Sequence, residues 1–453
     1  MTMATVNVQE VIDSRKLSGF QVLVVSLCAL IVLIDGFDTQ AIGYVAPAIV
    51  RSWHVDRAAL TPVFSAGLLG LMLGALAFGP VADRFGRKPV LIFCTLFFGV
   101  MSLLTSTADS VQSLIILRFI TGLGLGGAMP NAIALTTEYA PKRIRATTIM
   151  IMFCGFSLGA ALGGVAAASL ISHFGWKSVF VLGGIVPCLA FPFLAALLPE
   201  SIRYLVVQGE RGERVAAILR RIDPAASIPA GATFTVEEHK AKGFVVRQLF
   251  ANGRGPFTLL IWLVFFMSLL DLYFVTNWLP TIITDSGIAV SRAALITAMY
   301  QVGGILGTLL LGRLFDRFSP FVMLALTYLA ASVFVLLIGT VGTSIGALVL
   351  TVFGAGFCVV GGQIGANALT ANSYPTAIRS TGVGWALGIG RIGSIVGPMI
   401  GGQLLSLHWP IRQIFLVAAA PVLIASLAAL CISFLRRAPL AEEHGLQTGA
   451  STP

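Results

Sequence analysis

About a dozen long apolar stretches, separated by short polar segments, run through this 453-residue chain and constrain its fold more than any other feature. A helix needs about 20 apolar residues to cross the hydrocarbon core of a bilayer. No soluble fold can bury so many stretches of that length. Only 11% of the residues are charged, whereas a soluble domain carries roughly 25%. The sequence therefore predicts an all-α membrane protein.

The apolar stretches form two groups of six, with a longer polar segment between them. The predicted spans are 20–49, 58–82, 89–107, 111–139, 145–172 and 176–198, then 256–284, 293–315, 320–340, 344–373, 379–406 and 411–435. We predict two pseudo-symmetric six-helix bundles, at 20–199 and 256–436, with tails at 1–19 and 437–453 and a central loop at 200–255. The first stretch is too long for the core of a cleavable signal peptide, so we expect it to remain as a helix.

The positive charges are unevenly placed. If both termini lie inside, only five of the 29 Lys and Arg lie in outer loops, and two, Arg118 and Arg391, lie within spans. Such a bias predicts that both termini are cytoplasmic in the inner membrane. It also explains the net charge of +10 without a nucleic-acid partner. The five outer residues are Arg51, Arg57, Lys177, Arg292 and Arg412.

Cysteine and histidine give no sign of a metal site. The six Cys fall inside apolar stretches without close pairs, and the five His lie in loops or at span ends. The glycine run 122–127 lies in an apolar span with no preceding strand, which excludes a dinucleotide fingerprint. We expect no metal, cofactor or catalytic residues, and so no enzyme. In the central loop, 210–222 has an amphipathic pattern, which suits a helix on the inner leaflet or a solvated linker equally.

Two segments of the first half recur in the second. Gly79-Pro-Val-Ala-Asp-Arg-Phe returns as Gly312-Arg-Leu-Phe-Asp-Arg-Phe, and the segment at Tyr139 returns at Tyr374, at nearly the same offset. Duplicated halves are typical of secondary transporters, in which the substrate site lies between the halves near the bilayer midplane. The repeat therefore predicts a transporter.

These motifs resemble those of the major facilitator superfamily. The stretch from Gly79 to Lys88 is similar to its loop motif between spans two and three, and Gly312 to Arg317 is a degenerate second copy. The stretch from Arg118 to Gly127 is similar to the span-four motif, and Pro199 to Tyr204 to the motif that closes the first half. The resemblance covers essentially the whole chain and implies the twelve-helix fold of that superfamily.

Span one carries a narrower resemblance. Asp35-Gly-Phe-Asp38 resembles the DGxD motif of the aromatic acid:proton symporters. The resemblance implies a proton-coupled importer of an aromatic carboxylate such as a hydroxybenzoate, working by alternating access. The alternatives are a symporter of another small organic or sugar acid, and an efflux antiporter. Span five lacks the Gly-Pro pair of antiporters, which instead occurs in span eleven at Gly397-Pro398 and favours import. We expect a monomer whose partners are the anion, protons and the bilayer.

Asp35 and Asp38 are the candidate proton carriers. Being three residues apart, they share a helix face. Carboxylates inside a membrane usually face a cavity or a partner, and two close together raise each other's proton affinity. The alternative is that one of them pairs with an arginine or adjoins a kink at Gly36. The resemblance implies that Arg118 takes part in proton coupling or positions these aspartates, although a structural salt bridge fits it equally.

Arg391 is the candidate anchor for the substrate carboxylate, because guanidinium binds carboxylate through two parallel hydrogen bonds. The alternative is an internal ion pair with Asp271 or Asp35. Asp271 could contact substrate hydroxyls, bind a second proton or pair with Arg391, and the sequence does not separate these roles. Polar and aromatic residues of the second half complete the predicted substrate site: Tyr273, Asn277, Trp278, Tyr300, Gln301, Gln363 and Asn367.

The loop motifs provide candidate gating residues. The resemblance implies that they latch the inner side shut, and Glu138 is expected to form an ion pair with the nearby Arg143 or Arg145. The predicted gating residues are Asp83, Arg84, Arg87, Glu138, Arg145, Asp316 and Arg317.

Overall fold

A computed structural model describes residues 5–14, 16–208, 212–224, 229, 232–235, 245–374 and 378–448. The chain divides into two compact units, Met1–His239 and Lys240–Pro453. Within the described residues, twelve helices are long and apolar enough to cross a membrane, six in each unit, as predicted. In the first unit they are α2 (Gly19–Trp53), α3 (Thr61–Phe85), α4 (Arg87–Thr105), α5 (Val111–Tyr139), α6 (Arg145–Phe174) and α7 (Lys177–Leu197). In the second unit they are α11 (Gly255–Asp285), α12 (Val290–Arg317), α13 (Pro320–Ile338), α14 (Ile345–Ser373), α15 (Arg379–Ser406) and α16 (Ile411–Thr448).

Short elements flank the long helices. They are β1 (Thr5–Asn7), α1 (Val8–Ser14), η1 (Arg57–Leu60), η2 (Lys142–Ile144), α8 (Ile202–Val207), α9 (Gly212–Ile222), β2 (Thr233–Thr235) and α10 (Val245–Gln248). Local chemistry fixes where the long helices begin. Ser18 and Gln21 form a reciprocal capping box at the start of α2, and Ser110 with Ser113 does the same for α5. These side chains satisfy amide groups that a helix leaves unpaired in its first turn.

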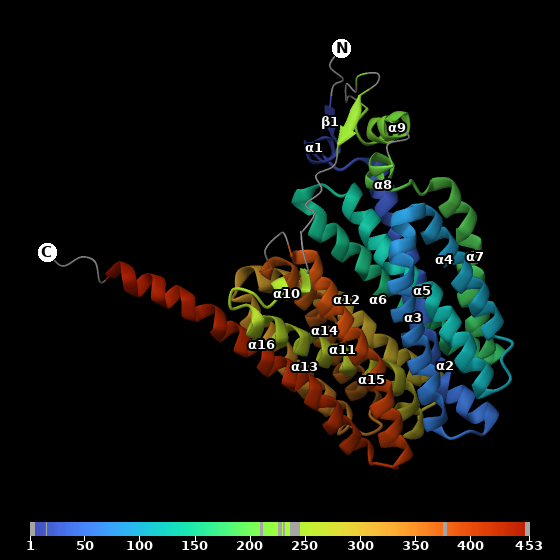
Figure 1. Ribbon diagram of the computed structural model, residues 1–453. Coiled ribbons are helices and arrows are strands. Elements are labelled where there is room, and N and C mark those ends of the chain that lie inside the picture. Colours follow the sequence, from blue (N-terminus) through green and yellow to red (C-terminus); the bar gives the residue numbers. More distant parts are fainter. Residues whose placement is uncertain are drawn as a thin grey trace. The chain divides into compact units, whose positions relative to one another are not determined.

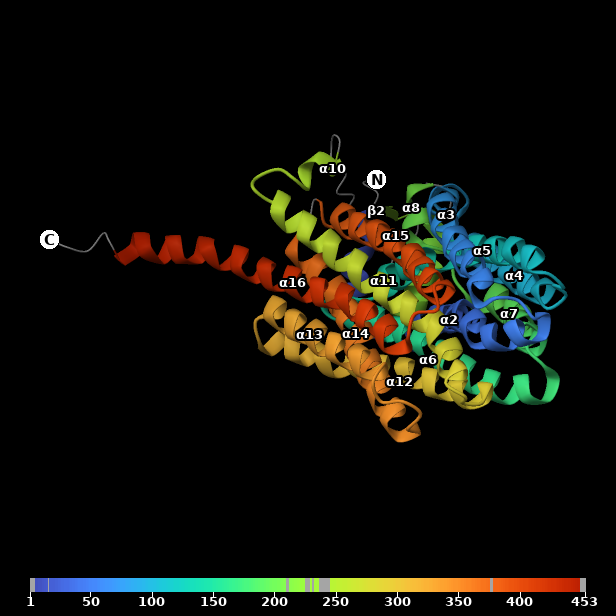
Figure 2. The ribbon, with the colours of Figure 1, turned by 90° about the horizontal axis from the view of Figure 1, so that it is seen from below.

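Helix pairing is the same in the two units. In the first, α2 packs on α6 and α3 on α5, while α4 contacts α5 and α7. In the second, α11 packs on α15 and α12 on α14, while α13 contacts α14 and α16 (Figures 1 and 2). Each helix of the first unit thus has a counterpart in the second with the same neighbours. The predicted pseudo-symmetric six-helix bundles are confirmed.

Glycines let the paired helices approach to backbone contact. A Cβ added to Gly70 would lie 2.1 Å from the carbonyl oxygen of Phe119. In the second unit, a Cβ on Gly303 would lie 2.2 Å from the carbonyl oxygen of Phe353. Small residues at such crossings replace side-chain packing with direct backbone contact, which is how helices associate in lipid. The same contact therefore recurs in the second unit, at the offset of the sequence repeat.

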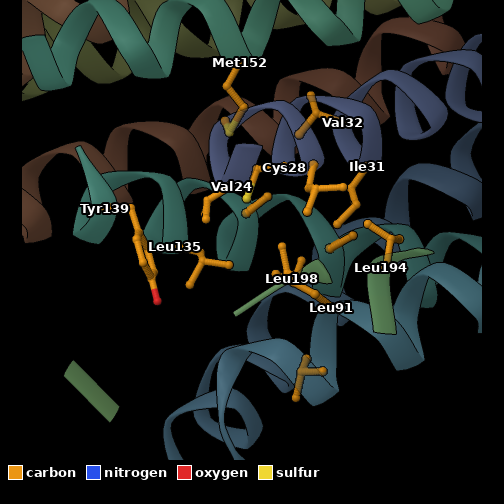
Figure 3. Packing of buried hydrophobic residues seen from close by; sticks show 14 of the residues in the cluster. Val24, Cys28, Ile31, Val32, Leu91, Leu135, Tyr139, Met152, Leu194 and Leu198 are labelled. Atoms are coloured by element: carbon orange, nitrogen blue, oxygen red, sulfur yellow. The ribbon is translucent and has the colours of Figure 1, made fainter. Parts of the chain in front are cut away.

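Buried apolar side chains fill the first unit. Figure 3 shows part of this cluster, with Val24, Cys28 and Ile31 of α2 near Leu91 and Leu194 from α4 and α7. Cys28 is a free thiol and packs as a small apolar residue. Outside the cluster, many large apolar side chains remain exposed, among them Leu76 at 68% and Leu189 at 65%. Such a surface suits lipid and not water.

Helices α8 and α9 and strand β2 of the central segment, together with β1 and α1, form a cap at one end of the first unit (Figure 1). Strands β1 and β2 pair in parallel, with Val6 opposite Phe234. The apolar face of α9, which includes Val215 and Leu219, is buried and contacts α1, α2 and α8. The guanidinium of Arg221 lies 4.1 Å from the ring centroid of Phe20. Protein therefore covers the apolar face of α9, which differs from both alternatives considered for it, a leaflet surface and a solvated linker.

The glycine contacts predict a position-specific cost. A Cβ on Gly74 would lie 2.1 Å from the carbonyl oxygen of Leu123, whereas a Cβ on Gly79 of the same helix would meet nothing within 4 Å. We expect Gly74→Ala to lower the free energy of unfolding in detergent micelles by about 1–3 kcal/mol through overpacking. Gly79→Ala is the matched control and should leave stability unchanged or slightly higher. Equal effects of the two substitutions would contradict this account of the crossing.

Candidate functional site

A buried ion pair joins α2 to α5 inside the first unit. Nη1 of Arg118 lies 2.9 Å from Oδ2 of Asp38, and Nη2 donates to the backbone carbonyl of Asp38 at 3.2 Å. The hydroxyl of Ser102 on α4 donates to the other carboxylate oxygen at 2.8 Å. The guanidinium also lies 5.7 Å from the centroid of the Phe180 ring. With side-chain exposures of 3% and 0%, the two charges are removed from solvent and neutralise each other.

Asp35 lies one turn before Asp38 and has a different environment. It is fully buried and accepts a hydrogen bond from the Thr39 hydroxyl at 3.0 Å. Between the two aspartates, Gly36 packs against the carbonyl of Phe156 on α6, where an added Cβ would lie only 2.1 Å away. This contact fixes the rotation of α2. The two carboxyl groups of the Asp35-Gly-Phe-Asp38 segment are thus chemically distinct, because Asp38 forms the ion pair with Arg118.

Arg391 lies on α15, where the helix is closest to α11. A Cβ on Gly393 would lie 2.2 Å from the carbonyl of Phe266. The half-buried Arg391 donates from Nη1 to the phenol oxygen of Tyr273 at 3.2 Å. Asp271 is fully buried, and neither of its carboxylate oxygens has a hydrogen-bond partner among the described residues. The ion pair between Arg391 and Asp271, which the sequence left open, does not form in this structure.

The other predicted substrate residues fall into two groups. Trp278 donates to the carbonyl of Pro398 at 2.9 Å and so joins α11 to α15, whereas Asn277 donates to the carbonyl of Tyr273 at 2.7 Å within α11. Gln363 accepts from Ser268 of α11, while its amide nitrogen has no partner within the described part of the chain. Oδ1 of Asn367 and the hydroxyl of Tyr300 likewise have no hydrogen-bond partner among the described residues. Gln301 is buried at 2% exposure.

A second polar network lies at the end of the first unit that carries the α3–α4 loop. Glu138 pairs with Arg87 and accepts from the Ser201 hydroxyl at 2.6 Å. Its ion-pair partner in the described structure therefore comes from α4, instead of the expected Arg143 or Arg145. Arg145 donates to the carbonyl of Ala140 at 3.4 Å. The difference arises because the α3–α4 loop folds back against the end of α5, which sequence separation does not reveal.

Glu200 is a functional candidate that the sequence patterns did not single out. Its Oε1 accepts from the backbone amides of Arg87 at 2.8 Å and Lys88 at 3.1 Å, at the start of α4. A carboxylate in this place satisfies unpaired amides and complements the positive end of the helix dipole. Gly86 just before them has φ of 102°, and a Cβ there would lie 2.5 Å from Glu200 Oε2. The sequence feature that could have identified Glu200 is its place as the acidic residue of the motif from Pro199 to Tyr204.

The remaining gating candidates lie at helix ends. Arg84 is exposed, stacks over Phe85 at 5.4 Å, and its carbonyl accepts from the Tyr204 hydroxyl at 3.3 Å. Asp83 is also exposed. In the second unit Arg317 stacks over Phe318 at 5.9 Å, repeating the arginine–phenylalanine pair. The side chain of Asp316 lies outside the described residues.

Comparisons with known proteins agree with this architecture. The family model described as Major Facilitator Superfamily matches residues 28–281 and 261–451. The chain is 44% identical over 426 residues to the 4-hydroxybenzoate transporter PcaK of Pseudomonas aeruginosa, covering 94% of this chain and 95% of that one. It is 42% identical over 431 residues to a gallate transporter of Pseudomonas putida, at 94% and 95% coverage.

Solved structures agree in fold. A bacterial homologue of the human lysosomal transporter Spinster, solved in an inward-facing and occupied conformation, superposes with a TM-score of 0.70 at 18% identity. The match covers 91% of this chain and 97% of that one. At this identity the likeness supports the twelve-helix fold alone.

The buried pair predicts non-additive stability changes. Asp38→Asn should leave Arg118 as an uncompensated buried charge and lower the free energy of unfolding by about 3–5 kcal/mol. Arg118→Gln should do the same to Asp38, and the double variant should lose clearly less than the two single losses added together. Chemical unfolding of the four proteins in detergent measures the coupling. As a control, Asp13→Asn removes the exposed ion pair with Lys142 at 3.7 Å and should change stability by no more than about 1 kcal/mol. Additive losses would show that the pair does not act as a unit.

Proposed function

The chain belongs to the major facilitator superfamily, and from that premise we propose that it imports an aromatic carboxylate, such as a hydroxybenzoate, together with protons. Members of this family are multi-pass membrane transporters and not enzymes. The observation that carries the substrate class is the similarity over 94% of the chain to transporters named for 4-hydroxybenzoate and gallate. Alternating access is part of the proposal.

We assign the substrate carboxylate to Arg391. A guanidinium presents two parallel donors to a carboxylate, and here its neighbour is the phenol of Tyr273. Both groups donate hydrogen bonds, so an incoming anion would meet convergent donors. Tyr273 is 5% exposed and lies one turn before Asn277 on α11. The aromatic ring of Tyr273 also provides a face for stacking with an aromatic substrate.

Asp35 is the proton carrier in this proposal. Asp38 already has a countercharge, because Arg118 lies 2.9 Å away. Asp35 shares a hydrogen bond with the neutral Thr39 hydroxyl, so a change in its protonation leaves the Asp38–Arg118 pair intact. Arg118 then acts by positioning the helix turn that holds both aspartates. Protonation of Asp35 and docking of the anion on Arg391 lower the cost of closing a cavity around charge.

The network around Glu138 and Glu200 is assigned to gating. It joins the α3–α4 loop to the segment after α7 through Arg87, Lys88 and Ser201. We place it on the cytoplasmic side, with both termini, because of the excess of Lys and Arg in these segments. The protein is proposed to lie in the cytoplasmic membrane as a monomer.

Proton coupling is tested in sealed vesicles that contain the purified protein. Radiolabelled 4-hydroxybenzoate should accumulate when the outside is made acidic, and a protonophore should abolish accumulation. Asp35→Asn should lower accumulation but keep exchange of labelled for unlabelled substrate, because exchange needs no net proton transfer. Asp109→Asn, in an exposed loop, is the matched control. Accumulation that persists without a proton gradient would refute symport.

Substrate anchoring is tested at Arg391. Arg391→Lys keeps the charge but loses the planar pair of donors, so binding of 4-hydroxybenzoate should weaken by roughly 10- to 100-fold, as expected for the loss of about 1.5–3 kcal/mol. Calorimetry on the purified protein measures the dissociation constant. Arg412→Lys, at an exposed position after α15, should bind normally. Unchanged affinity in Arg391→Lys would remove this residue from the substrate site.

A further inference from the structure

The internal repeat aligns α2 with α11 residue by residue. A Cβ on Gly159 would lie 1.8 Å from the carbonyl oxygen of Leu33, and one on Gly393 would lie 2.2 Å from the carbonyl oxygen of Phe266. The same backbone contact is thus made once in each unit, and it pairs Leu33 of α2 with Phe266 of α11. Counting forward from these two residues by the same number of positions reaches Asp38 on α2 and Asp271 on α11. This register makes Asp271 the counterpart of Asp38.

A second glycine contact gives the same register. Gly163 lies beside the carbonyl oxygen of Phe37, with a Cβ distance of 3.6 Å, and Gly397 lies beside that of Leu270, at 2.2 Å. Phe37 and Leu270 are therefore counterparts too, and each directly precedes one of the two aspartates. Both buried carboxyl groups occupy equivalent places in their bundles.

The partners of Asp38 have no polar counterparts in the second unit. Gly70 contacts Phe119, and its counterpart Gly303 contacts Phe353, so the position equivalent to Arg118 is Val352. Helices α4 and α13 have the same length, and matching their first residues makes Val335 the position equivalent to Ser102. Both valines are fully buried. Asp271 therefore has the same carboxyl group as Asp38, but valines stand where Asp38 has its countercharge and its hydroxyl donor.

A tyrosine in the second unit corresponds to a glycine that lies beside the arginine in the first unit. A Cβ on Gly67 would lie 3.9 Å from Nε of Arg118. Because Gly70 corresponds to Gly303, the counterpart of Gly67 is Tyr300, which is fully buried. Tyr300 is neutral, so it cannot compensate a negative charge as Arg118 does. The second unit thus has a tyrosine at the position where the first unit has a glycine beside the guanidinium of Arg118.

Buried ionisable side chains on two further helices of this unit are neutral as well: Tyr328 of α13 and Cys358 of α14. On α15 the only ionisable side chain within its membrane span is Arg391, which donates to Tyr273. Arg412 and Cys431 of α16 are exposed. An ionised carboxylate in such a place would be buried without a countercharge, which costs several kcal/mol, whereas a protonated one avoids that cost.

We propose that Asp271 is a second proton-binding site, protonated in the conformation described here, and that its proton is exchanged in each transport cycle. This inference rests on the proposed proton-coupled import and extends it to two transported protons, one on each unit. The geometry that carries it is a fully buried carboxyl group, without a hydrogen-bond partner among the described residues, at the place where the other unit holds an aspartate–arginine pair.

Infrared spectroscopy tests proton binding without any transport assay. The purified protein should show a carbonyl stretch of a protonated carboxyl group at neutral pH, which shifts in deuterated water and is absent in Asp271→Asn. Asp109→Asn, at an exposed position, is the matched control and should keep the band. An unchanged band in Asp271→Asn would overturn the proposal. Thermal unfolding of each variant verifies that it is folded.

Accumulation measured in vesicles tests whether the proton moves. At zero membrane potential, one pH unit of gradient gives about tenfold accumulation for each proton carried. The wild-type protein should therefore accumulate substrate about 100-fold, and Asp271→Asn about tenfold. Asp271→Asn should still exchange labelled for unlabelled substrate. Equal accumulation by the two proteins would contradict transport of a second proton on Asp271, but it would not contradict the proposed function. No accumulation by either protein would overturn the proposed function, while the infrared band would still report on Asp271. Dependence on Na⁺ at constant pH would identify a metal cation and overturn the proton assignment.

Introducing an arginine near Asp271 tests the proposal from the opposite direction. Val352→Arg together with Tyr300→Gly rebuilds in the second unit the arrangement of Arg118 and Gly67. If the variant is folded, the new guanidinium should hold Asp271 ionised, so the infrared band should disappear and accumulation should fall as in Asp271→Asn. A folded variant that keeps the band and full accumulation would contradict the equivalence of the two sites.

Discussion

Burial of carboxyl groups inside apolar helices is the constraint on which this structure depends. Such a group must find a countercharge, a hydrogen-bond donor or a proton, because lipid and apolar side chains offer none. Asp38 meets this demand with Arg118 and Ser102. The pair crosses from α2 to α5 and lies against α4 and α7, so it ties the centre of the first unit together. The polar chemistry of the unit is arranged around that neutralised core.

The two units share a backbone and differ in the charges that it carries. Glycine contacts fix the helix crossings at equivalent places, since a side chain at Gly74 or Gly307 would collide with a neighbouring backbone. With the crossings fixed, side chains could change without altering the packing. Arginine is found on the fourth spanning helix of the first unit, at Arg118, and on the fifth of the second, at Arg391. One guanidinium therefore neutralises an internal aspartate, while the other donates to a phenol.

Most of the fold was predictable from the sequence, because the length of the apolar stretches and the internal repeat can be read without knowledge of contacts. The ion-pair partner of each buried charge could not be predicted in this way. Asp38 and Arg118 are 80 residues apart, and only the folded helices bring them together. Glu138 pairs with Arg87 and not with its sequence neighbours for the same reason. The sequence suited α9 equally to a membrane surface or a solvated linker, yet the protein itself covers its apolar face, since α1, α2, α8 and β2 contact it.

The two ion pairs of the first unit differ in how far their side chains are buried. Arg118 and Asp38 are 3% and 0% exposed, whereas Arg87 and Glu138 are 16% and 13% exposed. Breaking the deeper pair would strand two charges away from water, at a cost of several kcal/mol each. The shallower pair lies closer to solvent, which can hydrate the separated charges, so the cost of opening it is smaller. A pair that must form and break in each cycle belongs at the edge of the unit, and a pair that must keep α2 in place belongs at its centre. This is the division expected if the Arg87–Glu138 pair opens in each cycle, as proposed, and the Arg118–Asp38 pair stays closed.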